Sequence, residues 1–140
     1  MLWPHHQGKP AVEVMLTLAQ GSQPMPRKLL ADTGAGSVRS PFEIILDEDD
    51  CLFCDSTPDH PVSLHGAYQG SFPTYWVRVQ LPALEFEQII RVIGVPSPPA
   101  GFEGIACFRF LNRFNFGNFA DPAQFGLEMP QEKRRSAIRQ

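Results

Sequence analysis

Prolines and glycines interrupt this chain at short intervals along its whole length. The 140 residues include 14 prolines and 11 glycines, and neither type is confined to one region. Proline removes a backbone donor and glycine disfavours a helix interior, so this spacing leaves room for short strands and turns but not for long helices. We therefore expect an all-β chain, and its length predicts one domain with a single core.

Alternating apolar residues mark the strands. Residues 11–20 carry apolar side chains at every second position, which predicts a half-buried strand: Val12, Val14, Leu16 and Leu18. Residues 27–31 return as a second strand after a turn at residues 21–26. Residues 38–46 are expected to form a strand or a short helical segment, and helical spacing of apolar residues predicts one short helix at about residues 106–114. Further extended segments are expected at residues 75–81, at 86–95 as a strand-pair candidate, and in two short pieces within 116–128.

The composition excludes several classes of protein. Hydrophobic residues make up 43% and charged residues 19% of the chain, a balance typical of a globular protein. The formal net charge is −3, so no basic field indicates binding to nucleic acid or to a membrane surface. The first twenty residues lack the apolar core of a secretory signal, and no stretch is long enough to span a membrane, which predicts a cytoplasmic protein. The odd number of cysteines argues against a disulfide framework.

One acidic residue occupies an unusual position in this pattern. Asp32 directly follows the apolar run Leu29–Ala31 and directly precedes Thr33 and Gly34. A carboxylate at the end of a buried strand is costly unless it is hydrogen-bonded or paired with a second acid that shares its proton. Asp32 is therefore the acidic residue of this chain that most needs a partner.

The segment Asp32-Thr33-Gly34-Ala35 resembles the active-site signature of the aspartic proteases. In a chain this short it resembles the retropepsin type, in which one polypeptide supplies half of the active site. The later motifs follow in the family's order: a glycine-containing flap at residues 65–72, a strand at 92–96, and a motif at 104–111 that leads into a helix. The resemblance implies a closed acid-protease barrel over residues 11–128, with a flap hairpin and one short helix near the C-terminus. Residues 1–10 are then a loose leader, and residues 129–140 a polar tail.

The resemblance also implies a mechanism. Asp32 would face Asp32 of a second chain in a homodimer, and the pair would activate water against a peptide bond without metal or cofactor. Thr33 would brace the two loops, and the Gly34 amide would hold the carboxylate. Ala35 offers no hydroxyl to the two carboxyls, so cleavage is expected to be optimal at mildly acidic to near-neutral pH. The flap would bind an extended, mostly apolar peptide through Gly66, Ala67, Tyr68, Gln69 and Gly70.

Two residues depart from the family's pattern. Cys107 stands where the family commonly has glycine, and Arg109 where it has Asp or Asn. Because cysteine is small and usually buried, we expect the fold to accommodate it. The departure leaves open an alternative, a catalytically inactive retropepsin-fold module that binds peptides or dimerises.

A second alternative rests on the other cysteines. Cys51 and Cys54, followed by His60 and His65, have the residue types of a zinc site, but the spacing to His60 is shorter than in zinc fingers. A small metal or redox barrel built on the two cysteines is the corresponding rival. The acidic run of residues 47–50 is expected to be a solvated loop, because the spacing of a calcium-binding loop is absent.

Overall fold

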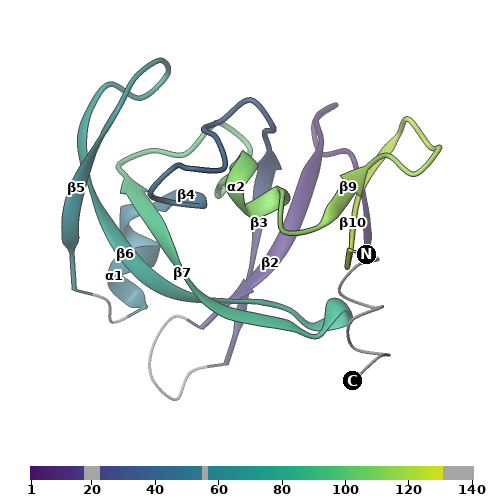
Figure 1. Ribbon diagram of the computed structural model, residues 1–140, viewed down its shortest axis with the longest axis horizontal. Coiled ribbons are helices and arrows are strands. Elements are labelled where there is room, and N and C mark those ends of the chain that lie inside the picture. The colour runs from purple at the N-terminus through teal and green to yellow at the C-terminus, as the bar shows by residue number, and fades with distance from the viewer. Residues whose placement is uncertain (18–22, 55–56, 131–140) are drawn as a thin grey trace.

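The computed structural model describes residues 1–17, 23–54 and 57–130. Strands predominate, and two short α-helices and one 3₁₀ turn interrupt them (Figure 1). The helical elements are α1 (Glu48–Phe53), η1 (Pro82–Leu84) and α2 (Phe108–Leu111). The strands are β1 (Leu2–Pro4), β2 (Ala11–Leu16), β3 (Met25–Ala31), β4 (Ile44–Asp47), β5 (Asp59–Leu64), β6 (Gly70–Leu81), β7 (Phe86–Val95), β8 (Gly104–Ala106), β9 (Asn115–Gly117) and β10 (Gln124–Glu128).

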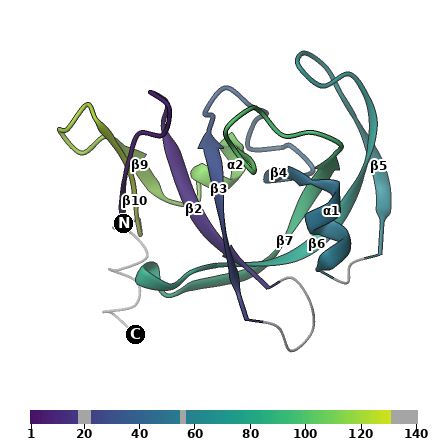
Figure 2. The same cartoon turned by 180° about the vertical axis from the view of Figure 1, so that it is seen from behind.

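Six of these strands close into a barrel. They pair in the order β2-β3-β8-β4-β7-β6, and β2 then pairs with β6 through Met15 and Leu16. β5 extends the sheet beyond β6 as a hairpin arm, and β1, β10 and β9 form a separate three-stranded sheet beside the barrel (Figures 1 and 2). The expected all-β class and closed barrel are confirmed.

The barrel interior holds the main core. Val12, Val14 and Leu16 of β2 are fully buried, while Glu13 between them is exposed, as the alternating pattern predicts. Each buried aliphatic side chain of this size stabilises the fold by about 1.5–3 kcal/mol. The part of this strand prediction that covers residues 18–20 lies outside the described residues, as does part of the turn expected at residues 21–26.

Strand β8 fits between β3 and β4 only because it begins with glycine. It pairs in parallel with β3 and antiparallel with β4. A Cβ atom on Gly104 would lie 2.3 Å from the backbone oxygen of Ile45 and 2.9 Å from a methyl group of Leu29. This close approach places the ends of β3 and β8 side by side.

The expectation of a loose leader over residues 1–10 is wrong for its first part. Leu2–Pro4 form β1, which pairs antiparallel with β10, and the Met1 amino group donates to the Leu127 carbonyl oxygen at 2.8 Å. The backbone groups of β1 find their partners more than 100 residues away, so no local pattern marks the strand. The tail expected at residues 129–140 lies almost wholly outside the described residues.

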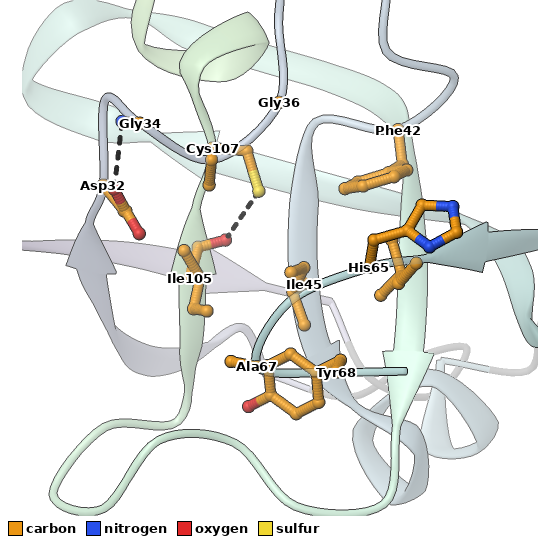
Figure 3. A pocket seen from close by; sticks show the side chains of 12 residues that line it. Asp32, Gly34, Gly36, Phe42, Ile45, His65, Ala67, Tyr68, Ile105 and Cys107 are labelled. Atoms are coloured by element: carbon orange, nitrogen blue, oxygen red, sulfur yellow. Dashed lines mark hydrogen bonds between the residues drawn. The ribbon is translucent and has the colours of Figure 1, made fainter. Parts of the chain in front are cut away.

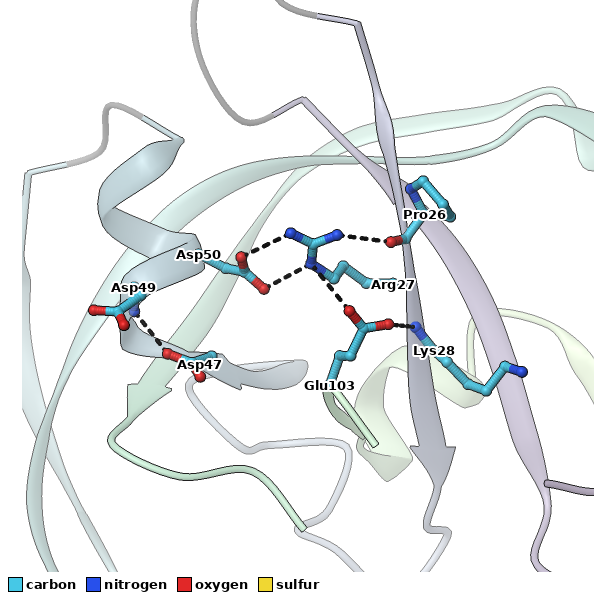
Figure 4. A network of polar contacts seen from close by, with 7 residues as sticks. All are labelled: Pro26, Arg27, Lys28, Asp47, Asp49, Asp50 and Glu103. Carbon is cyan, nitrogen blue, oxygen red and sulfur yellow. Dashed lines mark hydrogen bonds and ion pairs between the residues drawn. The ribbon is translucent and has the colours of Figure 1, made fainter. Parts of the chain in front are cut away.

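The acidic run of residues 47–50 begins a helix instead of forming a solvated loop. The Asp47 carboxylate accepts a hydrogen bond from the Asp49 amide at 2.9 Å and caps α1, and acids in the first turn favour a helix N-terminus. Arg27 of β3 forms two hydrogen bonds with Asp50, at 2.8 and 3.0 Å, and its Nε lies 3.6 Å from Glu103 (Figure 4). These contacts fasten α1 to the barrel and raise the pKa of Arg27, mainly through the hydrogen bonds to Asp50.

Three other elements differ in extent from the prediction. In the segment 38–46, which was expected to form a strand or a short helical segment, strand β4 begins only at Ile44 and ends at Asp47. Residues 86–95, expected as a strand pair, form one continuous strand, β7. The second helix covers only Phe108–Leu111, because residue 106 is still paired in β8 and Cys107 is extended (φ −83°, ψ 171°). The described residues therefore form two short α-helices where one was expected.

Candidate active site

Asp32 lies at the end of β3, in a turn whose backbone is fixed from both sides. Its amide donates to the carbonyl oxygen of Ala106, the last residue of β8, at 3.0 Å, and its carbonyl accepts from the Ala35 amide at 3.2 Å. The Gly34 amide donates to Asp32 Oδ1 at 3.0 Å (Figure 3). The carboxylate is half-buried, and its second oxygen has no hydrogen-bond partner among the described residues. That oxygen is available to a ligand or a second acid.

The loop that follows Asp32 is held by α2. The Ala35 carbonyl accepts from the Phe108 amide at 2.9 Å, and the Glu43 carbonyl accepts from the Cys107 amide at 3.1 Å. Arg109 donates to the Ser40 carbonyl oxygen at 2.5 Å. The helix thus fixes the position of the turn that carries the acid.

A cavity of about 300 Å³ lies between this turn and the hairpin of β5 and β6. Figure 3 shows Asp32 on one side of it, with Ile105 and Ile45 between Asp32 and the His65 side. The residues that line it come from the turn, from the barrel strands and from the hairpin: Asp32, Gly34, Ala35, Gly36, Phe42, Ile45, Leu64, His65, Ala67, Tyr68, Ile105 and Cys107. Most of these side chains are apolar, so the cavity suits an apolar group next to a carboxylate.

The flap (residues 65–72) forms the tip of the hairpin and the start of β6. Leu64 pairs with Gly70, and the turn between them contains Gly66 with φ +96°, a backbone conformation that glycine adopts without strain. The Tyr68 hydroxyl donates to the Ser97 carbonyl oxygen at 2.8 Å, and its ring packs edge-on against Phe72. Partial burial raises the pKa of Tyr68. The hydrogen bond fastens the flap over the cavity.

Cys107 forms part of the cavity wall and is fully buried. It packs in an apolar cluster with Phe42, Ile45 and Ile105, so the fold accommodates it as expected. Burial and the nearby charge of Asp32 raise the pKa of the Cys107 thiol to about 12. A thiol in this state is a poor nucleophile at neutral pH.

The cavity contains only part of the expected site. Asp32, Gly34, Ala35, Ala67 and Tyr68 line it. Thr33 and Gln69 are exposed outside its lining, as are Gly66 and Gly70, which shape the hairpin.

Sequence reasoning missed the floor of the cavity. Phe42 and Ile45 lie just before and within β4, and Ile105 lies on β8 about 60 residues later; only the pairing of β4 with β8 brings Ile105 next to Ile45. The apolar residues of β4 signalled burial, but no local signal assigned them to a site.

The residues of the zinc alternative do not form a metal site. Cys51 is buried on α1, Cys54 ends the same helix, and His60 is exposed on β5. Within residues 1–17, 23–54 and 57–130, no group of three or more His, Cys, Asp or Glu side chains is arranged to hold a metal ion.

Comparison with known protein families, with characterised proteins and with solved structures finds no match to this chain. In the described part of the chain, none of the helices has the length and apolar character needed to cross a membrane.

Proposed function

We propose that this protein is an aspartic endopeptidase of the retropepsin type, which acts as a homodimer on extended, mostly apolar peptide segments. The observation that carries the proposal is the position of Asp32, a half-buried carboxylate at the end of a barrel strand and on the wall of an apolar cavity beneath a hairpin. One carboxylate oxygen accepts from Gly34, and the other is available for chemistry.

The chemistry requires a second carboxyl group. In the proposed dimer, Asp32 of each chain faces its counterpart, and two carboxyls at hydrogen-bonding distance hold one proton between them. The ionised group takes a proton from a bound water, which attacks the peptide carbonyl carbon. The protonated group hydrogen-bonds to the carbonyl oxygen, and a proton then passes to the departing amine. The Gly34 amide keeps the carboxylate in a fixed orientation.

The shape of the molecule supports this dimer. The Asp32 turn, the tip of the flap hairpin and the β9–β10 loop all lie at the upper edge in Figures 1 and 2. A two-fold axis through this edge would bring the two Asp32 turns together. Leu2 and Phe119, which are 57% and 42% exposed, lie over Gly126 in the β1–β10–β9 sheet and offer apolar surface to a second copy.

The cavity supports an apolar substrate. Phe42, Ile45 and Ile105 form an apolar floor, and Tyr68 and Ala67 cover it from the flap. A substrate side chain that enters this space loses contact with water, which strengthens the hydrogen bonds of the reacting groups. Release of the Tyr68–Ser97 hydrogen bond would open the flap for substrate exchange.

The test is cleavage of a mixture of unstructured, apolar-rich peptides, with products identified by mass spectrometry. The protein is expected to cut within the peptides, and a statine-type transition-state mimic is expected to inhibit it. Asp32→Asn should abolish cleavage and keep the fold, because Asn retains an oxygen that accepts from the Gly34 amide. Asp47→Asn is the matched control, since Asp47 accepts the same type of bond from Asp49 but belongs to the cap of α1.

Two results would contradict the proposal. Cleavage by Asp32→Asn at the wild-type rate would remove Asp32 from the mechanism. Binding of the mimic without any cleavage would favour the inactive peptide-binding module, for which the buried Cys107 beside Asp32 is the structural argument.

A further inference from the structure

A second cavity lies on the outer surface of the barrel, and its lining shares no residue with the cavity beside Asp32. Its volume is about 350 Å³, and β6, β7, α2 and the segment before β4 contribute to its wall. Three arginines line it, Arg91 of β7, Arg109 of α2 and Arg113 just after α2, together with a single carboxylate, Glu43. Such convergence of guanidinium groups is unfavourable unless anions balance the charge.

The carboxylates of the protein balance only part of this charge. Glu43 is buried and accepts two hydrogen bonds from Arg113, at 2.5 and 2.8 Å. Asp59 accepts one from Arg91 Nη2 at 2.9 Å. Arg109 donates to a neutral carbonyl oxygen, and no carboxylate of the described residues lies within ion-pair distance of it. One positive charge at the cavity therefore remains without a counter-ion.

A second observation concerns Arg91. Its Nε atom is buried and has no hydrogen-bond partner among the described residues. Buried donors are normally satisfied, because water can no longer hydrate them. Because Arg91 lines the cavity, a small turn of its side chain towards a ligand would let an acceptor atom of that ligand satisfy this donor.

Apolar surface adjoins the positive charge. The Arg91 guanidinium carbon lies 4.6 Å from the centre of the Trp76 ring, which fixes the arginine against the indole. Trp76 is nevertheless 49% exposed, and Ile89 on the neighbouring strand is 54% exposed. Both residues line the cavity beside the arginines.

We propose that this cavity binds a ligand in which an oxyanion, a carboxylate or a phosphate, is attached to an aromatic or other apolar group. Arg109 and Arg91 hold the oxyanion, with Arg91 turned so that its Nε donates to it, and Trp76 and Ile89 contact the apolar part. Arg113 stays paired with Glu43 and contributes to the positive field. Planar guanidinium groups bind both carboxylates and phosphates, so the experiment below decides which of these two oxyanions is the preferred head group of the ligand.

The test uses Trp76 as the reporter. The chain contains two tryptophans, so Trp3→Phe leaves Trp76 as the sole source of indole fluorescence. Benzoate and phenyl phosphate, which combine an oxyanion with an aromatic ring, are titrated into this variant. Benzyl alcohol tests the aromatic ring without the anion, and inorganic phosphate tests the anion without the ring. Calorimetry on the unsubstituted chain with the same four probes keeps the test valid if Trp3→Phe perturbs the fold.

We expect saturable binding of benzoate or phenyl phosphate, and the tighter of the two identifies the head group. Arg109→Gln should weaken this binding by about tenfold or more, the effect of losing one charge-assisted hydrogen bond. Arg78→Gln is the matched control on β6, since Arg78 is an exposed arginine outside the cavity and should leave binding unchanged. The proposal is overturned if neither anion saturates, if benzyl alcohol binds as tightly as the anions, or if both arginine variants weaken binding equally.

Discussion

The ion pair between Glu43 and Arg113 connects the loop after Asp32 to the end of α2, and its loss should destabilise the whole protein. The Glu43 side chain is 5% exposed, whereas that of Arg113 is 35% exposed. Two hydrogen bonds join them, at 2.5 and 2.8 Å, and these bonds are the main reason that the pKa of Arg113 is raised. The pair therefore combines a nearly buried anion with a cation that reaches solvent.

Arg113→Met is the informative change. Methionine keeps an unbranched side chain near Phe86, whose ring centre lies 5.8 Å from the Arg113 guanidinium carbon, but it leaves the Glu43 carboxylate buried without its cation. Breaking a fully buried pair by removing one partner costs about 3–5 kcal/mol. Because a third of the Arg113 side chain is hydrated, we expect a smaller loss of about 2–3 kcal/mol in the free energy of unfolding. Urea denaturation followed by circular dichroism measures it.

The double variant separates the charge from the packing. Glu43→Gln alone should cost only about 1 kcal/mol, since Arg113 can turn its charge towards water. Glu43→Gln combined with Arg113→Met should be more stable than Arg113→Met by about 1 kcal/mol or more, because no buried charge is left. A loss below about 0.5 kcal/mol for Arg113→Met, or simple addition of the two single effects, would refute this reasoning.

Four further outcomes are expected, three from the packing of the fold and one from the proposed function. Gly104→Ala should lower the free energy of unfolding by about 1–3 kcal/mol in the same urea assay, since the new methyl group would collide with the Ile45 backbone oxygen; a neutral effect would contradict the packing of β8. The Cys107 thiol should resist iodoacetamide at pH 8 in the folded protein and react readily in urea, because burial raises its pKa to about 12. The same shift makes the free energy of unfolding fall as the pH rises from about 9 towards 12, because over this range the thiol ionises in the unfolded chain and stays protonated in the folded protein. Cys107→Ala should make this fall with pH less steep. In the proposed dimer, Ala35→Ser should move the pH optimum of peptide cleavage to more acidic values, because a hydroxyl can then donate to the proposed pair of carboxyls; an unchanged optimum would remove residue 35 from control of that pair.

Local patterns in the sequence were sufficient for β2, for β3 and for the turn that carries Asp32, whereas no pattern marked β8 as a strand. Alternation over residues 11–16 predicts β2 because one face of that strand packs into the barrel while Glu13 meets solvent. The glycines of the flap predict the hairpin tip, since Gly66 adopts a positive φ there. The position of Asp32 at a strand end is likewise a local property of an apolar run followed by glycine.

Features that depend on distant partners could not be predicted from the sequence. β1 exists because β10 pairs with it, and a three-residue strand containing Pro4 carries no pattern of its own. The helix α1 was missed for a different, local reason: its N-cap, Asp47, is itself one of the acids that suggested a loop. Glu43 and Arg113 lie 70 residues apart in the sequence, and the contribution of their ion pair to stability depends on the burial of Glu43, which only the folded chain defines.

Subunit mixing tests most directly whether two Asp32 carboxyls form one active site. The unsubstituted chain and Asp32→Asn are mixed at equal concentration, allowed to exchange subunits, and assayed for cleavage of a fluorogenic apolar peptide. If each site needs an acid from both chains, random pairing should reduce the activity per unsubstituted chain to about half, and an excess of Asp32→Asn should suppress it further. Activity that stays proportional to the unsubstituted chain at every ratio would contradict the two-chain site.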